Sequence, residues 1–322
     1  MNNRLIKILF LLLVTTAILN CQETDYGPGY QIIMKDNPAV TGSEGSGMLR
    51  LSYLNFYPGN HYDLHSVYLS YDSYFPAIHG GLGFYIADDY LGGIVNDIRG
   101  GFSYAYFLKA GKNFFINAGL SASVYHRGYD FGNAILPDQI DPLGTVLVPS
   151  GEILANSGRT VFDIGTGFLF ISGRLFGGFS VNHLAEPDVS ITGSPENKLN
   201  RKYLFHLSGD FDLSKSHGLR IRPLAMSGFQ KTFFSAGAGV VIESNYLSIN
   251  TILLTNNNKN TDIQTGFSFK TGRVMIYYNY RFNIVSGNQF LPMSLLHQTG
   301  ISFSLNNVEK RYSVGTINLP EM

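Results

Sequence analysis

The chain contains few of the features on which most protein classes depend. Cys21 is the only cysteine, so an intrachain disulfide cannot form. The chain also has no tryptophan. Only 14% of the 322 residues are Asp, Glu, Lys or Arg. Beyond Leu19, no run reaches the roughly 18 consecutive apolar residues of a transmembrane helix. These shortages exclude a helical membrane protein and are unlike the composition of a water-soluble α/β enzyme.

The N-terminus predicts export. Arg4 and Lys7 precede an apolar run over residues 8–19, which has the length of a secretory signal and is too short to span a membrane. Residues 1–21 are therefore predicted to be a cleaved signal peptide, with a buried helix as the alternative. Cys21 loosely resembles the lipidated cysteine of a lipoprotein, so lipidation and ordinary cleavage near Gln22 both stay open.

The remaining composition favours strands that face lipid. Removal of Arg4 and Lys7 with the signal leaves 21 basic residues against 23 acidic ones, which gives no electrostatic reason to expect nucleic acid. Aromatic residues make 14% of the chain and glycine occurs 36 times. No linker, charge block or shift in composition divides the mature chain, so we expect one domain.

The hydrophobic pattern has a period of two. Apolar residues alternate with small or polar ones over residues 115–124, 234–242 and 299–305, which cannot make one apolar helix face. A soluble β-sandwich also alternates, but it turns its apolar face toward a shared core. A transmembrane barrel turns it toward lipid and keeps a polar interior, which here would include Asn117, Ser121, Ser123, Asn182, Gln264, Asn279 and Arg281.

Fourteen such segments predict an all-β protein, a transmembrane antiparallel β-barrel of about 14 strands. They are residues 48–56, 63–73, 78–89, 98–110, 113–125, 160–171, 173–183, 200–213, 217–226, 231–243, 246–255, 261–269, 273–282 and 295–305. Tight connections alternate with longer ones, of which the main examples are residues 90–97, 126–159, 184–199 and 283–294.

Outer-membrane barrels have short periplasmic turns and longer outer loops, so this alternation predicts that both termini are periplasmic. The predicted organisation is a signal peptide (1–21), a periplasmic segment or plug (22–47), an outer-membrane barrel (48–306) and a periplasmic C-terminal tail (307–322). Aromatic residues gather near the strand ends, as interfacial girdles require.

Short signatures along nearly the whole mature chain resemble the PorP/SprF family, outer-membrane proteins associated with the type IX secretion and gliding motility machinery of Bacteroidetes. Tyr57 departs from the tryptophan that is common before the proline of the first hairpin. The positions that match the family's motifs are Asn37, Pro38, Ala39, Arg50, Asn55, Pro58, Gly59, Asp72, Asn182, His183, Leu184, Pro187, Arg201 and His206.

This resemblance implies a barrel at the bacterial outer membrane that helps to export or anchor a large, adhesin-like surface protein. The implied partners are that secreted client, the type IX secretion components and outer-membrane lipid. The alternative function is a passive or fatty-acid-type outer-membrane channel, since that class also has fourteen strands. An open lumen would favour the channel, and a plug formed by residues 22–47 would close it.

No catalytic constellation, cofactor site or metal site is expected. The eight histidines include no His-Glu-x-x-His pair, and the glycine pairs lie inside strands rather than before a helix. Asp138 and Asp141 fall short of the six to eight oxygens that Ca²⁺ prefers. His183 resembles a base that could activate a serine in a barrel phospholipase, but a structural hydrogen bond is the preferred interpretation, and the protein is predicted not to be an enzyme.

Overall fold

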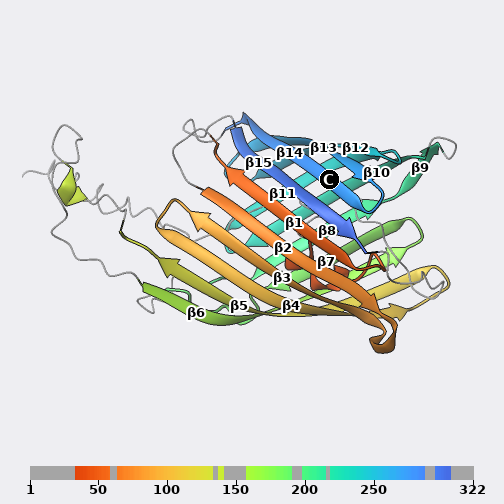
Figure 1. Cartoon of the computed structure of the whole chain (residues 1–322), viewed down its shortest axis with the longest axis horizontal. Coiled ribbons are helices and arrows are strands. Elements are labelled where there is room, and N and C mark those ends of the chain that lie inside the picture. The colour runs from red at the N-terminus through yellow and green to blue at the C-terminus, as the bar shows by residue number, and fades with distance from the viewer. Residues whose placement is uncertain are drawn as a thin grey trace, which may run out of the picture.

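A computed structural model describes residues 33–58, 64–132, 137–140, 157–190, 198–214, 218–286 and 294–305, which form one antiparallel β-barrel (Figure 1). Among the described residues, two short helices, α2 (Ile33–Asp36) and η1 (Pro38–Val40), precede the first strand. The strands are β1 (Met48–Phe56), β2 (Leu64–Phe75), β3 (Gly80–Leu91), β4 (Val95–Lys109), β5 (Phe114–Tyr129), β6 (Ser157–Ser172), β7 (Leu175–Asn182), β8 (Lys202–Gly209), β9 (Phe211–Ser214), β10 (Leu219–Gln230), β11 (Phe233–Glu243), β12 (Leu247–Asn256), β13 (Thr261–Thr271), β14 (Val274–Val285) and β15 (Ser294–Ser304).

The barrel is closed because β15 pairs with β1 and every other pairing joins neighbours along the chain. β8 and β9 pair one after the other with β10 and are separated only by Asp210, so together they form one interrupted strand. The prediction of fourteen antiparallel strands is therefore confirmed. Of the two other short helices, η2 (Pro76–Ile78) lies between β2 and β3 and η3 (Pro137–Gln139) between β5 and β6.

Side chains alternate between the outside of the barrel and its interior, as predicted. On β5, Leu120 is 60% exposed whereas Asn117 is 1% exposed. All of the polar residues expected to line the interior are buried, apart from Ser121, which is half-buried. Because the exposed face carries Leu, Ile, Val and Phe on nearly every strand, the outer surface suits contact with lipid.

The interior is less uniformly polar than the alternation predicted. Inward-facing apolar residues from five strands pack around Ala39 and Val40 of η1: Leu169, Ile171, Phe176, Leu224, Val241 and Ile252. Several of them lie near the tight turns, where glycines such as Gly173 and Gly272 adopt positive φ. This cluster exists because a second apolar element lies inside the barrel, and strand periodicity alone cannot reveal such an element.

Three predicted loops are shorter than expected, and one of them, residues 283–294, shrinks to 286–293 because β14 extends to Val285. Residues 90–97 shrink to a turn over 92–94, since β3 and β4 pair as far as Leu91 and Val95. The predicted loop 126–159 shrinks to 130–156, since β5 and β6 pair as far as Tyr129 and Ser157. The β5–β6 hairpin consequently extends further than its neighbours toward the end of the barrel that carries the long connections, at the left of Figure 1.

The predicted signal peptide with Cys21, the motif position Gly59 and the C-terminal tail lie outside the described residues. Within the described ranges, no helix has the length and apolar character needed to cross a membrane.

Candidate functional site in the barrel interior

Residues 33–47, hereafter the plug segment, lie inside the barrel, with η1 against the inner faces of β4, β5 and β6 (Figure 1). Most of its side chains are buried, including the motif residues Pro38 and Ala39. Gly119 makes this approach possible, because a Cβ added there would overlap the backbone of both motif residues. The backbone of the plug segment thus packs directly on the wall of β5.

Asn37 makes the first attachment of the plug segment. Its side-chain oxygen accepts the backbone N–H of Ala39 at 3.0 Å and so caps η1. Its amide nitrogen donates to the carbonyl of Phe168 at 3.3 Å and lies 3.0 Å from Nε2 of His206. Gly167 leaves the space for this side chain. Two motif positions that are 169 residues apart in the sequence, Asn37 and His206, therefore contact each other.

Asp72 on β2 makes the second attachment. Its carboxylate pairs with the guanidinium of Arg50 on β1 and accepts the backbone N–H of Gly42 at 2.7 Å. Arg50 pairs in addition with Glu44 of the plug segment. Arg50 and Asp72 are both buried, so these bonds form where solvent screens charge weakly. The pair holds the C-terminal part of the plug segment against the wall, and Gly42 supplies the positive φ of +72° that its turn requires.

The third attachment holds the end of α2. The carbonyl of Asp36 accepts hydrogen bonds from the hydroxyl of Ser180 at 2.6 Å and from the amide of Asn182 at 2.8 Å. Nζ of Lys202 lies 3.9 Å from the Asp36 carboxylate. Both hydrogen-bond donors come from β7, so this attachment fixes the plug segment to a part of the wall that is distant in the strand order from β2 and Asp72.

His183 ends β7. It adopts a left-handed conformation with φ of +57°, which turns the chain out of the strand direction. Its Nδ1 lies 2.7 Å from the carboxylate of Asp163 on β6. Burial lowers the pKa of His183 below its ordinary value, although Asp163 opposes the shift. A neutral imidazole that donates Nδ1–H to Asp163 is the form this environment favours.

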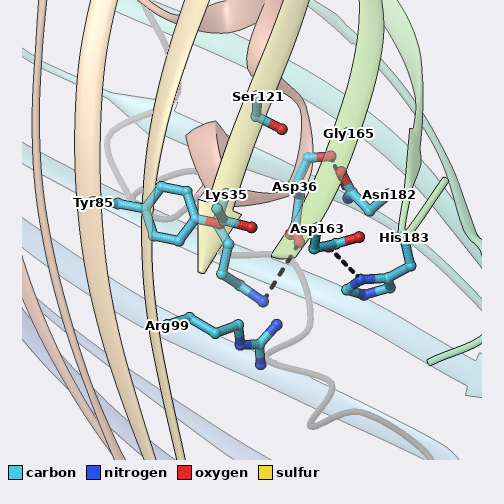
Figure 2. Close-up of a pocket in the computed structure, with 10 residues that line it drawn as sticks. Lys35, Asp36, Tyr85, Arg99, Ser121, Asp163, Gly165, Asn182 and His183 are labelled. Atoms are coloured by element: carbon cyan, nitrogen blue, oxygen red, sulfur yellow. Dashed lines mark hydrogen bonds and ion pairs between the residues drawn. The ribbon is translucent and has the colours of Figure 1, made fainter. Parts of the chain in front are cut away.

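Next to His183 lies a small polar cavity of about 20 Å³ (Figure 2). Figure 2 shows Lys35 and Asp36 entering it from the plug segment, with Arg99 below them and the Asp163–His183 pair at the side. Two basic side chains thus face two carboxylates. Among the described residues no group of three or more acidic, histidine or cysteine side chains is arranged to hold a metal ion.

The remaining motif positions lie elsewhere. Arg201 donates to the carbonyl of Leu184 at 3.2 Å, and the carbonyl of Pro187 accepts the N–H of Leu199 at 3.0 Å, so these positions shape the connection after β7. Asn55 and Pro58 lie at the long-connection end of β1, apart from the plug segment.

The sequence analysis did not identify Asp36 and Glu44, which take part in the attachments of the plug segment, or Asp163, which pairs with His183. The signal for Asp163 was present, since it is a charged residue at an inward position of an alternating strand, and such a residue needs a partner.

The closed fourteen-stranded barrel, apolar outside and charge-paired inside, defines an outer-membrane β-barrel protein. The fold is similar to several solved barrels. The P. putida toluene transporter TodX shares 11% identity over 88% of this chain and 95% of that chain, with a TM-score of 0.49. A TodX deletion mutant, a monoaromatic hydrocarbon channel, shares 8% over 87% and 94%, with a TM-score of 0.50. The KdgM porin shares 11% over 80% and 98%, with a TM-score of 0.38. At these identities the likeness shows the fold alone.

The family model of the type IX secretion system membrane protein PorP/SprF matches residues 30–303, and the chain belongs to this family. No curated protein matches the chain. The expected family and outer-membrane location are thus confirmed, and membership links the chain to the type IX secretion machinery.

Proposed function

We propose that this barrel helps to export or anchor a large surface protein of the adhesin type, with the type IX secretion components as its other partners, and that it does not act as an open channel. The observation that carries this proposal is the plug segment, which three separate sets of contacts hold inside the barrel. Motif residues of the family take part in all three sets. A barrel for steady passive diffusion needs an open lumen, and the plug segment occupies part of that lumen.

In this proposal both termini are periplasmic and the long connections lie at the cell surface, where they can reach the client. The channel alternative draws on the fold shared with hydrocarbon channels, but a fold does not define a function. The interior of the barrel favours the anchoring role over the channel. The described interior holds the plug segment and buried ion pairs such as Arg127–Asp97 at 2.6 Å.

Deletion of the gene tests this function. We expect one or a few large type IX clients to disappear from the cell surface and to accumulate in the medium or inside the cell. Quantitative mass spectrometry of shaved surface peptides and of culture supernatant measures the change. Complementation with the wild-type chain should restore the surface protein. If every type IX client keeps its wild-type surface level in the deletion strain, the proposal is wrong.

We also propose that the chain is not an enzyme and that the His183–Asp163 pair is structural. The imidazole is buried and its Nδ1 is committed to Asp163. Purified barrel in mixed phospholipid micelles should therefore release fatty acid no faster than a His183→Ala variant does. A lipid hydrolysis rate that is abolished in His183→Ala, with the barrel still folded, would contradict this prediction.

A further inference from the structure

The barrel wall has an incomplete stretch beside β6. This strand spans 16 residues, whereas β7 spans eight and pairs with it only from Thr166 to Ser172. From Ser157 to Gly165, β6 pairs with β5 on one side and with no described strand on the other. This stretch, residues 157–165, is hereafter the open edge of β6.

The open edge presents backbone groups in a regular row. In an antiparallel strand the N–H and C=O of one residue point to the same side, and the side changes at each residue. The carbonyl of Ile164 accepts the N–H of Leu184 at 3.0 Å across the β7 side. Gly158, Thr160 and Phe162 therefore direct their N–H and C=O groups to that same side, where the described chain provides no backbone partner.

Motif residues create this edge. The left-handed backbone of His183, held by Asp163, stops β7, and Arg201 binds the carbonyl of Leu184. The connection that follows turns inward instead of continuing along β6.

Two contacts hold the connection in that position. Val189 is buried against Tyr125, and the carbonyl of Ser190 accepts from Arg159 at 2.8 Å. The end of β7 is thus anchored away from the edge, and no strand of the described residues covers the row of groups on β6.

We infer that the open edge of β6 binds an extended segment of the secreted surface protein as an added β-strand, a partner that rests on the proposed function. Only a polypeptide offers donors and acceptors in the spacing that this row requires; an acyl chain offers none and a lipid headgroup offers no such row. The three residues with unpaired backbone groups would pair with a client segment, hereafter the guest strand, of roughly five to seven residues.

The side chains of β6 along the open edge define which residue types the guest strand should carry. Phe162, which is 58% exposed, and Ile164 point outward, so guest side chains beside them are apolar. Arg159, Val161 and Asp163 lie on the other face of the strand, and Asp163 lines the polar cavity, so guest side chains beside Arg159 and Asp163 are polar or charged. The segment sought in the client therefore alternates apolar and polar residues.

A proline at the edge tests the inference. Thr160→Pro removes one edge N–H and leaves the β5 ladder intact, because the N–H of Thr160 points away from β5. Thr160→Ala is the matched control, since it loses the same hydroxyl, which lies 2.8 Å from Nδ1 of His126, but keeps the N–H. We expect the client identified by gene deletion to be released at least about fivefold more in Thr160→Pro than in Thr160→Ala. Equal surface retention in the two strains would overturn the inference while leaving the proposed function in place.

Hydrogen exchange gives a second readout that does not depend on the deletion strain. The amides of Gly158, Thr160 and Phe162 should exchange slowly in outer-membrane vesicles from wild-type cells and faster in the barrel purified alone, since the guest strand is then missing. Equal protection in both samples would mean that another part of this chain covers the edge. Equal rapid exchange in both would mean that nothing does. Either of these two results overturns the inference.

Discussion

Replacing Gly119 with valine is expected to expel the plug segment from the barrel. A Cβ at this position would overlap the backbone of Pro38 and Ala39, and backbone cannot turn aside as a flexible side chain can. Movement of η1 away from β5 would also strain the bonds that Asn37 makes with Phe168 and His206. The purified variant should therefore show steady ion conductance in planar bilayers, where the wild-type barrel should show none.

The control for this experiment is Gly100→Val on the neighbouring strand β4. A Cβ at Gly100 meets nothing closer than the Tyr85 carbonyl at 4.0 Å, so this variant should stay closed. Heat-modifiable electrophoretic mobility would first establish that each barrel is folded. A folded Gly119→Val barrel that conducts no better than Gly100→Val would show that the plug segment does not control the lumen.

The fold could be predicted from the sequence because apolar and polar residues alternate locally along each strand. β1 begins and ends where the pattern predicted, and the segment predicted over residues 200–213 is interrupted only at Asp210. Strand ends were less accurate, as at β5 and β6, because cross-strand pairing continues through residues such as Arg127 and Arg159 that read as loop. Their charges are satisfied by Asp97 and Asp188, which no local pattern reveals.

The interior could be predicted only in part. The family resemblance singled out Asn37, Asp72 and His206, but not that Asn37 meets His206 or that Asp72 binds Gly42. Such contacts join residues up to 169 positions apart, and they depend on the closure of the whole barrel. The strand predicted over residues 173–183 is observed as β7, but the left-handed conformation of His183 that follows it was hidden, because it is a tertiary effect in a residue other than glycine.

Replacing Asp72 with alanine should destabilise the barrel more than loss of any exposed ion pair. The change leaves the buried guanidinium of Arg50 with Glu44 alone and removes the acceptor of the Gly42 N–H. Removal of one partner of a buried pair costs about 3–5 kcal/mol. Urea unfolding of barrels refolded into lipid vesicles measures this loss. Asp212→Ala is the matched control, since it breaks the exposed pair with Arg174 and should cost at most about 1 kcal/mol.

The double variant Arg50→Met with Asp72→Leu separates stability from closure. Apolar side chains of similar volume replace both members of the buried Arg50–Asp72 pair, so the free energy of unfolding should return toward the wild-type value. The N–H of Gly42 still lacks its acceptor and Glu44 loses its ion pair with residue 50, so the plug segment should remain loosened and the barrel should conduct. If Asp72→Ala proves no less stable than Asp212→Ala, the buried pair is not what holds the segment. If the double variant is stable and closed, the other two attachments suffice to keep it inside.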